Sequence, residues 1–120
     1  MTKKEARVSA LEVLYAADVR GEAPDVEGIG GRARRLVEGT WSRRGELDGE
    51  IEHAAKGWRV DRMPVVDRSV LRLALYELRH TDTPMAVVID QAVELAKAYS
   101  TGRSGSFVNG VLGKLAEPPA

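Results

Sequence analysis

The most constraining feature of this 120-residue sequence is the segment VVDRSVLRLALYEL at residues 65–78. A helix over this segment carries apolar side chains on most of its faces, and such a helix is normally buried at the centre of a domain. Elsewhere the apolar residues recur every three or four positions, which is helical spacing, and no segment alternates convincingly as a strand does. The sequence therefore predicts an all-α fold built around residues 65–78.

The predicted helices fall into two groups of three that together form one domain. The first subdomain, residues 1–60, holds predicted helices at residues 3–20, 32–44 and 46–57. The second subdomain, residues 61–120, holds a helical turn at 62–65 and predicted helices at 65–78, 84–99 and 104–115, and Pro118 and Pro119 are expected to end the fold.

Local residues mark where some of these helices begin and end. Thr2 and Glu5 have the spacing of a capping box, and Gly21 is expected to stop the first helix. Residues 21–31 are rich in glycine and acidic residues and are predicted to form a loop. Ser104 is a candidate N-cap for the last helix.

The last predicted helix contains one conflicting signal. Asn109–Gly110 lies between two apolar pairs, which is a recognised β-hairpin pattern. We favour a helix because the apolar residues of this segment have helical spacing and no partner sheet is predicted. Gly110 and Gly113 then lie inside a helix, where glycine costs about 1 kcal/mol relative to alanine. We expect these glycines to allow another backbone to approach closely.

The composition excludes several classes of protein. The chain has no cysteine, which rules out a disulfide scaffold, a cysteine-ligated metal site and a thiol nucleophile. Its two histidines, His53 and His80, cannot form a histidine-rich metal site by themselves. No apolar run approaches the ~18 residues that span a membrane, and the N-terminus lacks the apolar core of a signal peptide. We therefore expect a cytoplasmic protein.

The formal net charge is zero, because 18 basic residues balance 18 acidic ones, and this argues against a protein that coats nucleic acid indiscriminately. The charges are nevertheless grouped along the chain. Residues 32–44 hold five arginines and one glutamate, whereas residues 45–57 hold four acidic residues and one lysine. Such blocks either pair with each other or face different partners.

No residue pattern carries an enzymatic reaction. Asp67 and Glu77 are ten residues apart, so on one helix they point in different directions. Asp90 and Glu94 are one turn apart, but Lys97 follows one turn later and favours a salt bridge over a metal. Without an acid–base pair, a nucleophile or a ligand set, we expect neither an enzyme nor a cofactor.

Two segments have the character of a binding site. Lys3, Lys4 and Arg7 have helical spacing and should project from one side of the first helix, as phosphate contacts require, unless they are simply a frayed basic terminus. Before the last helix, Arg103 and Ser104 offer a cation and a hydroxyl. Phe107, the only phenylalanine, either belongs to the core or stacks on an unpaired base.

Three further residues have two interpretations each. Glu77 continues the apolar stripe of the central helix and is either the margin of the core or a polar anchor in a protein interface. Tyr15 continues the apolar stripe of Val8 and Leu11. It is, like Tyr76, either a core ring with a bonded hydroxyl or an interface residue.

Four segments together resemble the NusB family of bacterial transcription antitermination factors, in family order and at family spacing. They are ARVSALEVLYAAD at 6–18, DRSVLRLALYEL at 67–78, AVVIDQAVELAKAYS at 86–100 and SFVNGVL at 106–112. Residues 21–60 match only weakly. The resemblance implies an all-helical fold of two three-helix subdomains packed at an angle.

The resemblance also implies a function. Proteins of this kind bind the boxA element of nascent ribosomal RNA transcripts as single-stranded RNA, together with NusE, a protein of the small ribosomal subunit. The pair helps RNA polymerase to resist termination, with no reaction catalysed and no cofactor. Some members are monomers and others form homodimers that cover the RNA and partner surface, so the oligomeric state stays open.

The matched positions assign residues to each ligand by resemblance. Tyr15 and Glu77 match positions that face NusE. RNA is expected at Lys3, Lys4, Arg7, Gly102, Arg103, Ser104 and Phe107. Two alternatives remain: an RNA-binding domain cut from a ribosomal RNA cytosine methyltransferase, and a helical adaptor that binds protein only. With so few cations we expect weak RNA binding by the chain alone and shared recognition with NusE.

Overall fold

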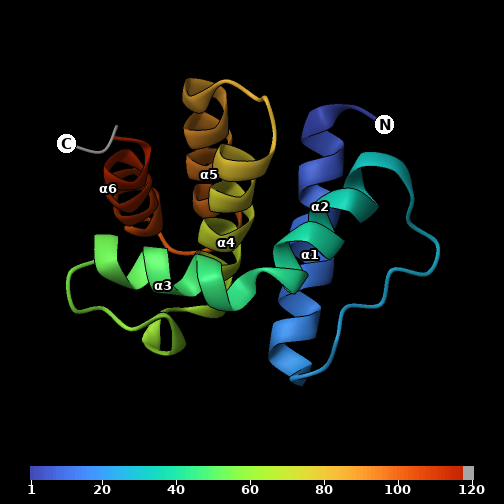
Figure 1. Ribbon diagram of the computed structural model, residues 1–120, viewed down its shortest axis with the longest axis horizontal. Helices are drawn as coiled ribbons and strands as arrows, with labels where there is room; N and C mark the ends of the chain where they lie inside the picture. Colours follow the sequence, from blue (N-terminus) through green and yellow to red (C-terminus); the bar gives the residue numbers. More distant parts are fainter. Residues whose placement is uncertain (118–120) are drawn as a thin grey trace.

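The computed structural model describes residues 1–117, and these residues form six α-helices, one short 3₁₀ helix and no strand (Figure 1). The elements are α1 (Lys3–Arg20), α2 (Gly31–Ser42), α3 (Arg44–Ala54), η1 (Val60–Arg62), α4 (Val65–His80), α5 (Met85–Tyr99) and α6 (Ser104–Ala116). The predicted all-α fold is confirmed. Pro118 and Pro119, which were expected to end the fold, lie outside the described residues.

The first helix begins and ends as its sequence predicts. Thr2 accepts a hydrogen bond from the backbone N–H of Glu5, and the Glu5 carboxylate accepts one from the backbone N–H of Thr2, at 3.1 and 2.9 Å. This reciprocal pair is a complete capping box. Gly21 follows the helix with a φ of 68°, a left-handed conformation that glycine adopts without steric cost.

The fourth helix lies at the centre of the fold. In Figure 1 α4 runs through the middle of the molecule, and it contacts α1, α2, α3, α5 and α6. Its side chains from Val70 to Leu75 are almost all buried, Arg72 being the exception. Burying each large aliphatic side chain contributes about 1.5–3 kcal/mol, so the apolar run organises the fold as predicted.

Helix boundaries differ from the prediction where local signals are weak. Only Arg43 separates α2 from α3. The third helix ends at Ala54, because Lys56 and Gly57 have positive φ values of 46° and 92°. The helical turn expected at 62–65 is the 3₁₀ helix, two residues earlier.

The segment with the conflicting hairpin signal is helical throughout, as favoured. The explanation offered for its glycines is wrong, because a Cβ atom at Gly110 or Gly113 would meet no atom within 4 Å. Close approach occurs elsewhere. The ring of Tyr76 occupies the space beside Gly39, and the aliphatic part of the Lys97 side chain packs against Gly105.

One continuous cluster of buried apolar side chains draws residues from all six α-helices and from η1. Helix contacts join α1 and α2 to α4, and α3 to α6, so the core crosses residue 60. The division into two subdomains at that residue stays a prediction.

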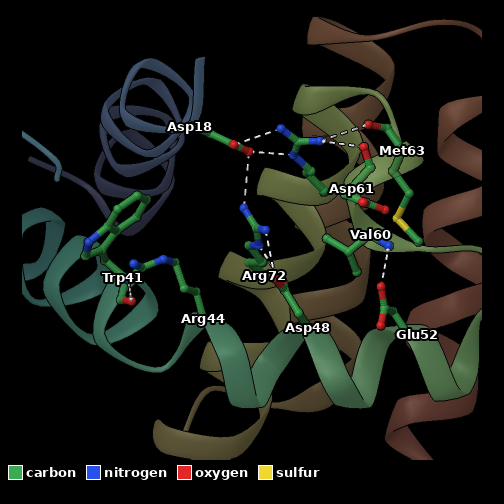
Figure 2. A network of polar contacts seen from close by, with 10 residues as sticks. Asp18, Trp41, Arg44, Asp48, Glu52, Val60, Asp61, Met63 and Arg72 are labelled. Atoms are coloured by element: carbon green, nitrogen blue, oxygen red, sulfur yellow. Dashed lines mark hydrogen bonds and ion pairs between the residues drawn. The ribbon is translucent and has the colours of Figure 1, made fainter. Parts of the chain in front are cut away.

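A network of ion pairs ties three helices together beside this core (Figure 2). Arg68 donates to both carboxylate oxygens of Asp18 at 2.6 and 2.8 Å. Arg72 bridges Asp18 at 3.1 Å and Asp48 at 2.7 and 2.8 Å, which connects α4 to α1 and to α3. Burial alone would raise the pKa of Asp18, but the hydrogen bonds and charges of the two arginines outweigh it and hold that pKa below its ordinary value.

Candidate nucleic-acid and protein interface

The start of α1 presents two exposed cations. Lys3 and Lys4 both lie on the surface, and the Lys4 ammonium lies 3.4 Å from Glu94 of α5. Both members of that pair are more than half exposed, and such pairs hold their partners weakly. The two lysines are therefore exposed, as expected from the sequence, and their contact with phosphate stays a prediction.

Arg7 does not project with these lysines. Its side chain is buried, and its Nε and Nη2 atoms donate to the two carboxylate oxygens of Glu77 at 2.8 and 3.0 Å. The expectation of an exposed Arg7 is therefore corrected. In this conformation the Arg7 guanidinium is paired with Glu77 inside the protein and does not face an external ligand.

The reason is a rotation of the buried face of α1 relative to the predicted stripe. The residues that turn inward are Ala6, Arg7, Ala10, Leu11, Leu14 and Ala17. Three alanines mark this face, and they are the signal that the prediction from Val8, Leu11 and Tyr15 overlooked. The same rotation turns Arg7 inward and leaves Tyr15 41% exposed.

Glu77 lies neither at the margin of the core nor on a protein-binding surface. It is only 2% exposed and both of its oxygens are bonded to Arg7. The two residues expected to face NusE therefore separate in the structure: Tyr15 lies outside and Glu77 lies inside. Tyr76 is partly buried, with its ring against Gly39 and 5.1 Å from the ring of His80.

A groove of about 390 Å³ runs between α1 and the end of α5. Two tyrosines border it, Tyr15 from α1 and Tyr99 from α5, and they are 41% and 49% exposed. Leu11, Glu12 and Val66 complete the lining. Exposed tyrosine rings beside a shallow groove are typical of protein interfaces, because each offers a large apolar face and a hydroxyl. Tyr99 was expected in the buried stripe of its helix and was not among the residues assigned to NusE, but its exposure places it on the surface.

The turn before α6 is hydrogen-bonded at both ends to one buried carboxylate, that of Asp67. Asp67 accepts hydrogen bonds from Ser100 at 2.6 Å and from Ser104 at 3.1 Å. Ser104 is 2% exposed, so the expectation that its hydroxyl caps α6 or faces a ligand is corrected. Gly102 and Arg103 lie on the surface.

Phe107 is partly in the core, and its stacking on an unpaired base stays a prediction. Its ring is partly buried against the core, and it also lies 6.1 Å from the ring of Trp58, at an interplanar angle of 57°. Trp58 is 57% exposed, and the sequence prediction did not include it. Its position directly after Gly57, near the expected end of a helix, was the available signal.

These residues do not share one pocket. They lie along the line where α1 faces α5, from Lys4 and Glu94 through Tyr15 and Tyr99 to the turn before α6, and we call this line the seam. The Lys4–Glu94 pair and the tyrosine groove both join α1 to α5, and Ser100 continues from α5 into the turn that carries Arg103. Lys4 and Tyr15 are eleven residues apart, which is about 16 Å along a helix. Any ligand that touches both ends of the seam must therefore be extended.

The described residues contain neither a metal-binding cluster nor a membrane-spanning helix. Within residues 1–117 no group of three or more histidine or acidic side chains could hold a metal ion. No helix in the same range is long and apolar enough to cross a membrane. Exposed cations, an aromatic groove and a clamped turn define a small all-α binding protein.

Comparison with known proteins identifies the family. The NusB family model matches residues 4–117, and the chain belongs to the NusB family. The resemblance seen in the sequence is thereby confirmed. Its curated relatives are transcription antitermination proteins, not enzymes.

These relatives match over most of their length. The chain is 47% identical to the transcription antitermination protein NusB of Saccharopolyspora erythraea, over 95% of this chain and 86% of the relative. It is 41% identical to the protein of the same name from Symbiobacterium thermophilum, over 96% of this chain and 89% of the relative.

Solved structures agree with the fold. A structure of T. maritima NusB superposes with a TM-score of 0.86 at 34% identity, covering 97% of this chain and 91% of that chain. A crystal structure of the antitermination factors NusB and NusE in complex with double-stranded RNA contains a chain that superposes with a TM-score of 0.83. That chain is 34% identical, with 95% of each chain covered.

Proposed function

We propose that this protein is a transcription antitermination factor that binds boxA single-stranded RNA of nascent ribosomal RNA transcripts together with NusE. The observation that carries the proposal is the seam between α1 and α5, which joins exposed cations to an aromatic groove. Its similarity to a NusB chain solved with NusE and RNA supports the same function. A factor with this role acts on RNA polymerase and its transcript, so we assign the protein to the cytoplasm.

RNA is assigned to the polar ends of the seam. Lys3 and Lys4 supply phosphate contacts at the start of α1, where the helix dipole also favours anions. Gly102 and Arg103 supply a backbone surface and a cation at the turn before α6. Phe107 contributes the exposed part of its ring, beside Trp58.

Arg7 and Ser104, which the resemblance also assigns to RNA, act indirectly in this proposal. Arg7 holds α1 against α4 through Glu77, so it positions the two lysines one turn earlier. Ser104 holds the turn through Asp67, so it positions Arg103. The proposal therefore separates the residues that contact RNA, Lys3, Lys4 and Arg103, from Arg7 and Ser104, which hold those residues in position.

NusE is assigned to the tyrosine groove. Tyr15 and Tyr99 offer rings and hydroxyls to a partner, and Glu12 adds one charge at the edge. Glu77 contributes through its effect on α1 rather than by direct contact. A homodimer that covers this seam stays a prediction.

The first experiment tests the lysines. Lys3→Ala with Lys4→Ala should weaken binding of a fluorescent boxA oligonucleotide in the presence of NusE, measured by anisotropy. The slope of log K against log[salt] should also become shallower by about 0.7 for each phosphate that the variant no longer neutralises. The matched control is Arg34→Ala with Arg43→Ala, which removes the same charge from α2 and from the residue that follows it. Equal affinity and slope in the lysine variant and the wild type would refute the assignment.

The second experiment tests the groove in the absence of RNA. Tyr15→Ala should weaken NusE binding in calorimetry, because an interface tyrosine at a groove typically contributes about 1 kcal/mol or more. Trp58→Ala is the control, since it removes an exposed aromatic ring that does not line the groove. A protein-only adaptor would bind NusE normally and show no salt-dependent RNA binding.

A further inference from the structure

Five arginines lie in the basic segment of residues 32–44, and three of them have partners on the surface. Arg34 pairs with Glu38 at 3.3 Å and Arg43 pairs with Glu46 at 3.7 Å. Arg44 lies 3.9 Å over the ring of Trp41 and donates to its carbonyl oxygen.

The other two arginines, Arg32 and Arg35, are different. Neither makes an ion pair or a side-chain hydrogen bond with any residue in the described range 1–117. They are three positions apart on α2, so they share a helix face.

That face lines a pocket of about 250 Å³ between the start of α2 and the end of α4. Arg32 and Arg35 form one wall, and Tyr76, His80 and Thr81 form the other. Asp82 is the single acid in the lining, and it forms no ion pair with either guanidinium in the described part of the chain. The pocket therefore collects two unpaired cations and several hydrogen-bonding groups around a small volume.

The aromatic wall is fixed by packing. The Tyr76 ring fills the space that a Cβ atom at position 39 would need, so Gly39 is what allows the ring to lie across α2. On its other side the ring lies 5.1 Å from that of His80, with an interplanar angle of 33°. This wall is present before any ligand binds.

The start of α2 adds a third favourable element. Its N-cap is Gly30, which offers no side-chain cap, and its first turn contains no acidic residue. The positive end of the helix dipole is therefore uncompensated beside Arg32. Backbone N–H groups and arginine forks at one helix end are the groups that hold a phosphate.

We propose that this pocket binds a phosphate group of the same RNA strand that contacts Lys3 and Lys4. The inference rests on the proposed function and extends the RNA path from α1 onto α2. Tyr76 and His80 flank Glu77 on α4, and Glu77 holds Arg7, one turn from Lys3. Figure 1 shows the start of α2 beside the N-terminal half of α1, and these two helices are in contact. Arg32 belongs to the first turn of α2, and Lys3 and Lys4 belong to the first turn of α1.

The chemistry favours a phosphate over an acidic protein segment. Two planar guanidinium groups and the Tyr76 hydroxyl suit one tetrahedral anion with several acceptor oxygens, whereas the Thr81 hydroxyl already donates to the Glu77 carbonyl oxygen. A docked protein segment needs a larger apolar area, whereas Leu36 is the only aliphatic side chain in this lining.

The test compares Arg32→Ala with Arg35→Ala in one variant against the Arg34→Ala, Arg43→Ala control. Both variants remove two positive charges from the same segment. The probe is a boxA RNA extended by several nucleotides on each side, bound to the complex with NusE. The pocket variant should bind more weakly, with a salt slope shallower by about 0.7 because one phosphate is no longer neutralised. The control should match the wild type.

A second readout follows the pocket itself. The ring resonances of His80 and Tyr76 should shift when the extended RNA is added to the wild-type complex, and thermal unfolding should show that the variant is folded. An unchanged slope, or rings that do not respond, overturns the proposal. So does a pocket variant that fails to bind NusE without RNA, which would identify a protein surface.

The outcomes also separate the two levels of inference. If the Lys3, Lys4 variant binds RNA more weakly and the pocket variant does not, the proposed function stands and the phosphate pocket fails. If wild-type protein with NusE binds no boxA RNA, both fail.

Discussion

Arg7 and Glu77 form a two-point ion pair in the protein interior, although 70 residues separate them in the chain. Their side chains are 5% and 3% exposed, and the hydrogen bonds measure 2.8 and 3.0 Å. The pair joins α1 to α4 one turn from the exposed lysines. A bidentate bond of this kind fixes the rotation of α1 as well as its position.

We expect Arg7→Ala to destabilise the protein by about 3–5 kcal/mol, because it leaves the Glu77 carboxylate buried and unpaired. Urea-induced unfolding measures this change. The double change Arg7→Met with Glu77→Leu should recover most of that stability, since it removes both charges and keeps the volume. Lys4→Ala, which removes a cation from an exposed pair, is the control. An Arg7→Ala variant as stable as that control would contradict the role of the pair.

The network around Asp18 predicts a loss of stability in acid. Burial by itself raises the pKa of Asp18, but the hydrogen bonds and charges of Arg68 and Arg72 lower it by more. The pKa of Asp18 is therefore below its ordinary value. The charged form therefore stabilises the fold above the unfolded-state pKa of about 3.9, and this contribution disappears as the pH falls through the lower native value. Asp18→Asn should be less stable than wild type at pH 7, with a difference that shrinks below about pH 4.

Urea unfolding at a series of pH values measures this difference. Asp90→Asn is the matched control, because Asp90 is exposed on α5 and belongs to no ion pair within residues 1–117. A difference between wild type and Asp18→Asn that stays constant from pH 7 to pH 3 would argue against the network as its cause.

Two glycine substitutions should change stability in opposite directions. Gly39→Ala forces the Tyr76 ring away from α2, and such overpacking costs about 1–3 kcal/mol. Gly110→Ala adds a methyl group in open space on a helix, which should stabilise by about 0.5–1 kcal/mol. Thermal unfolding measures both. Destabilisation by Gly110→Ala would show that something contacts that face.

Ser104 distinguishes a positioning role from direct contact with RNA. Ser104→Ala removes one donor from the buried Asp67 carboxylate, so we expect it to destabilise by about 1–3 kcal/mol. Ser106→Ala, on the exposed side of the same helix, should have no such effect. Weaker RNA binding by Ser104→Ala at unchanged stability would instead indicate direct contact.

The sequence predicted those features of the fold that depend on neighbouring residues. The capping box of Thr2 and Glu5, the left-handed Gly21 and the apolar run around Leu73 are all local, and the structure confirms each of them. Helix ends were predicted less well, and the end at Ala54, for example, depends on the positive φ values of Lys56 and Gly57.

The site was predicted less completely than the fold. Lys3 and Lys4 are exposed in the first turn of α1, as expected, and their contact with RNA stays a prediction. Arg7 has the same spacing but is buried, because its partner Glu77 lies on another helix. A complementary charge so far along the chain cannot be inferred from one helix. The groove that Tyr99 borders and the pocket beside Arg32 likewise form only where helices that are distant in sequence pack together.

The clamp of Asp67 on Ser100 and Ser104 has a consequence for the cost of recognition. A flexible turn loses conformational entropy when a ligand orders it, at about 1–2 kcal/mol for each residue fixed. Here hydrogen bonds to Asp67 already fix Ser100 and Ser104 at the two ends of the turn, so a ligand at Arg103 has less of the chain to order. A protein with so few cations can then retain a useful affinity, because little of its binding energy is spent on ordering itself.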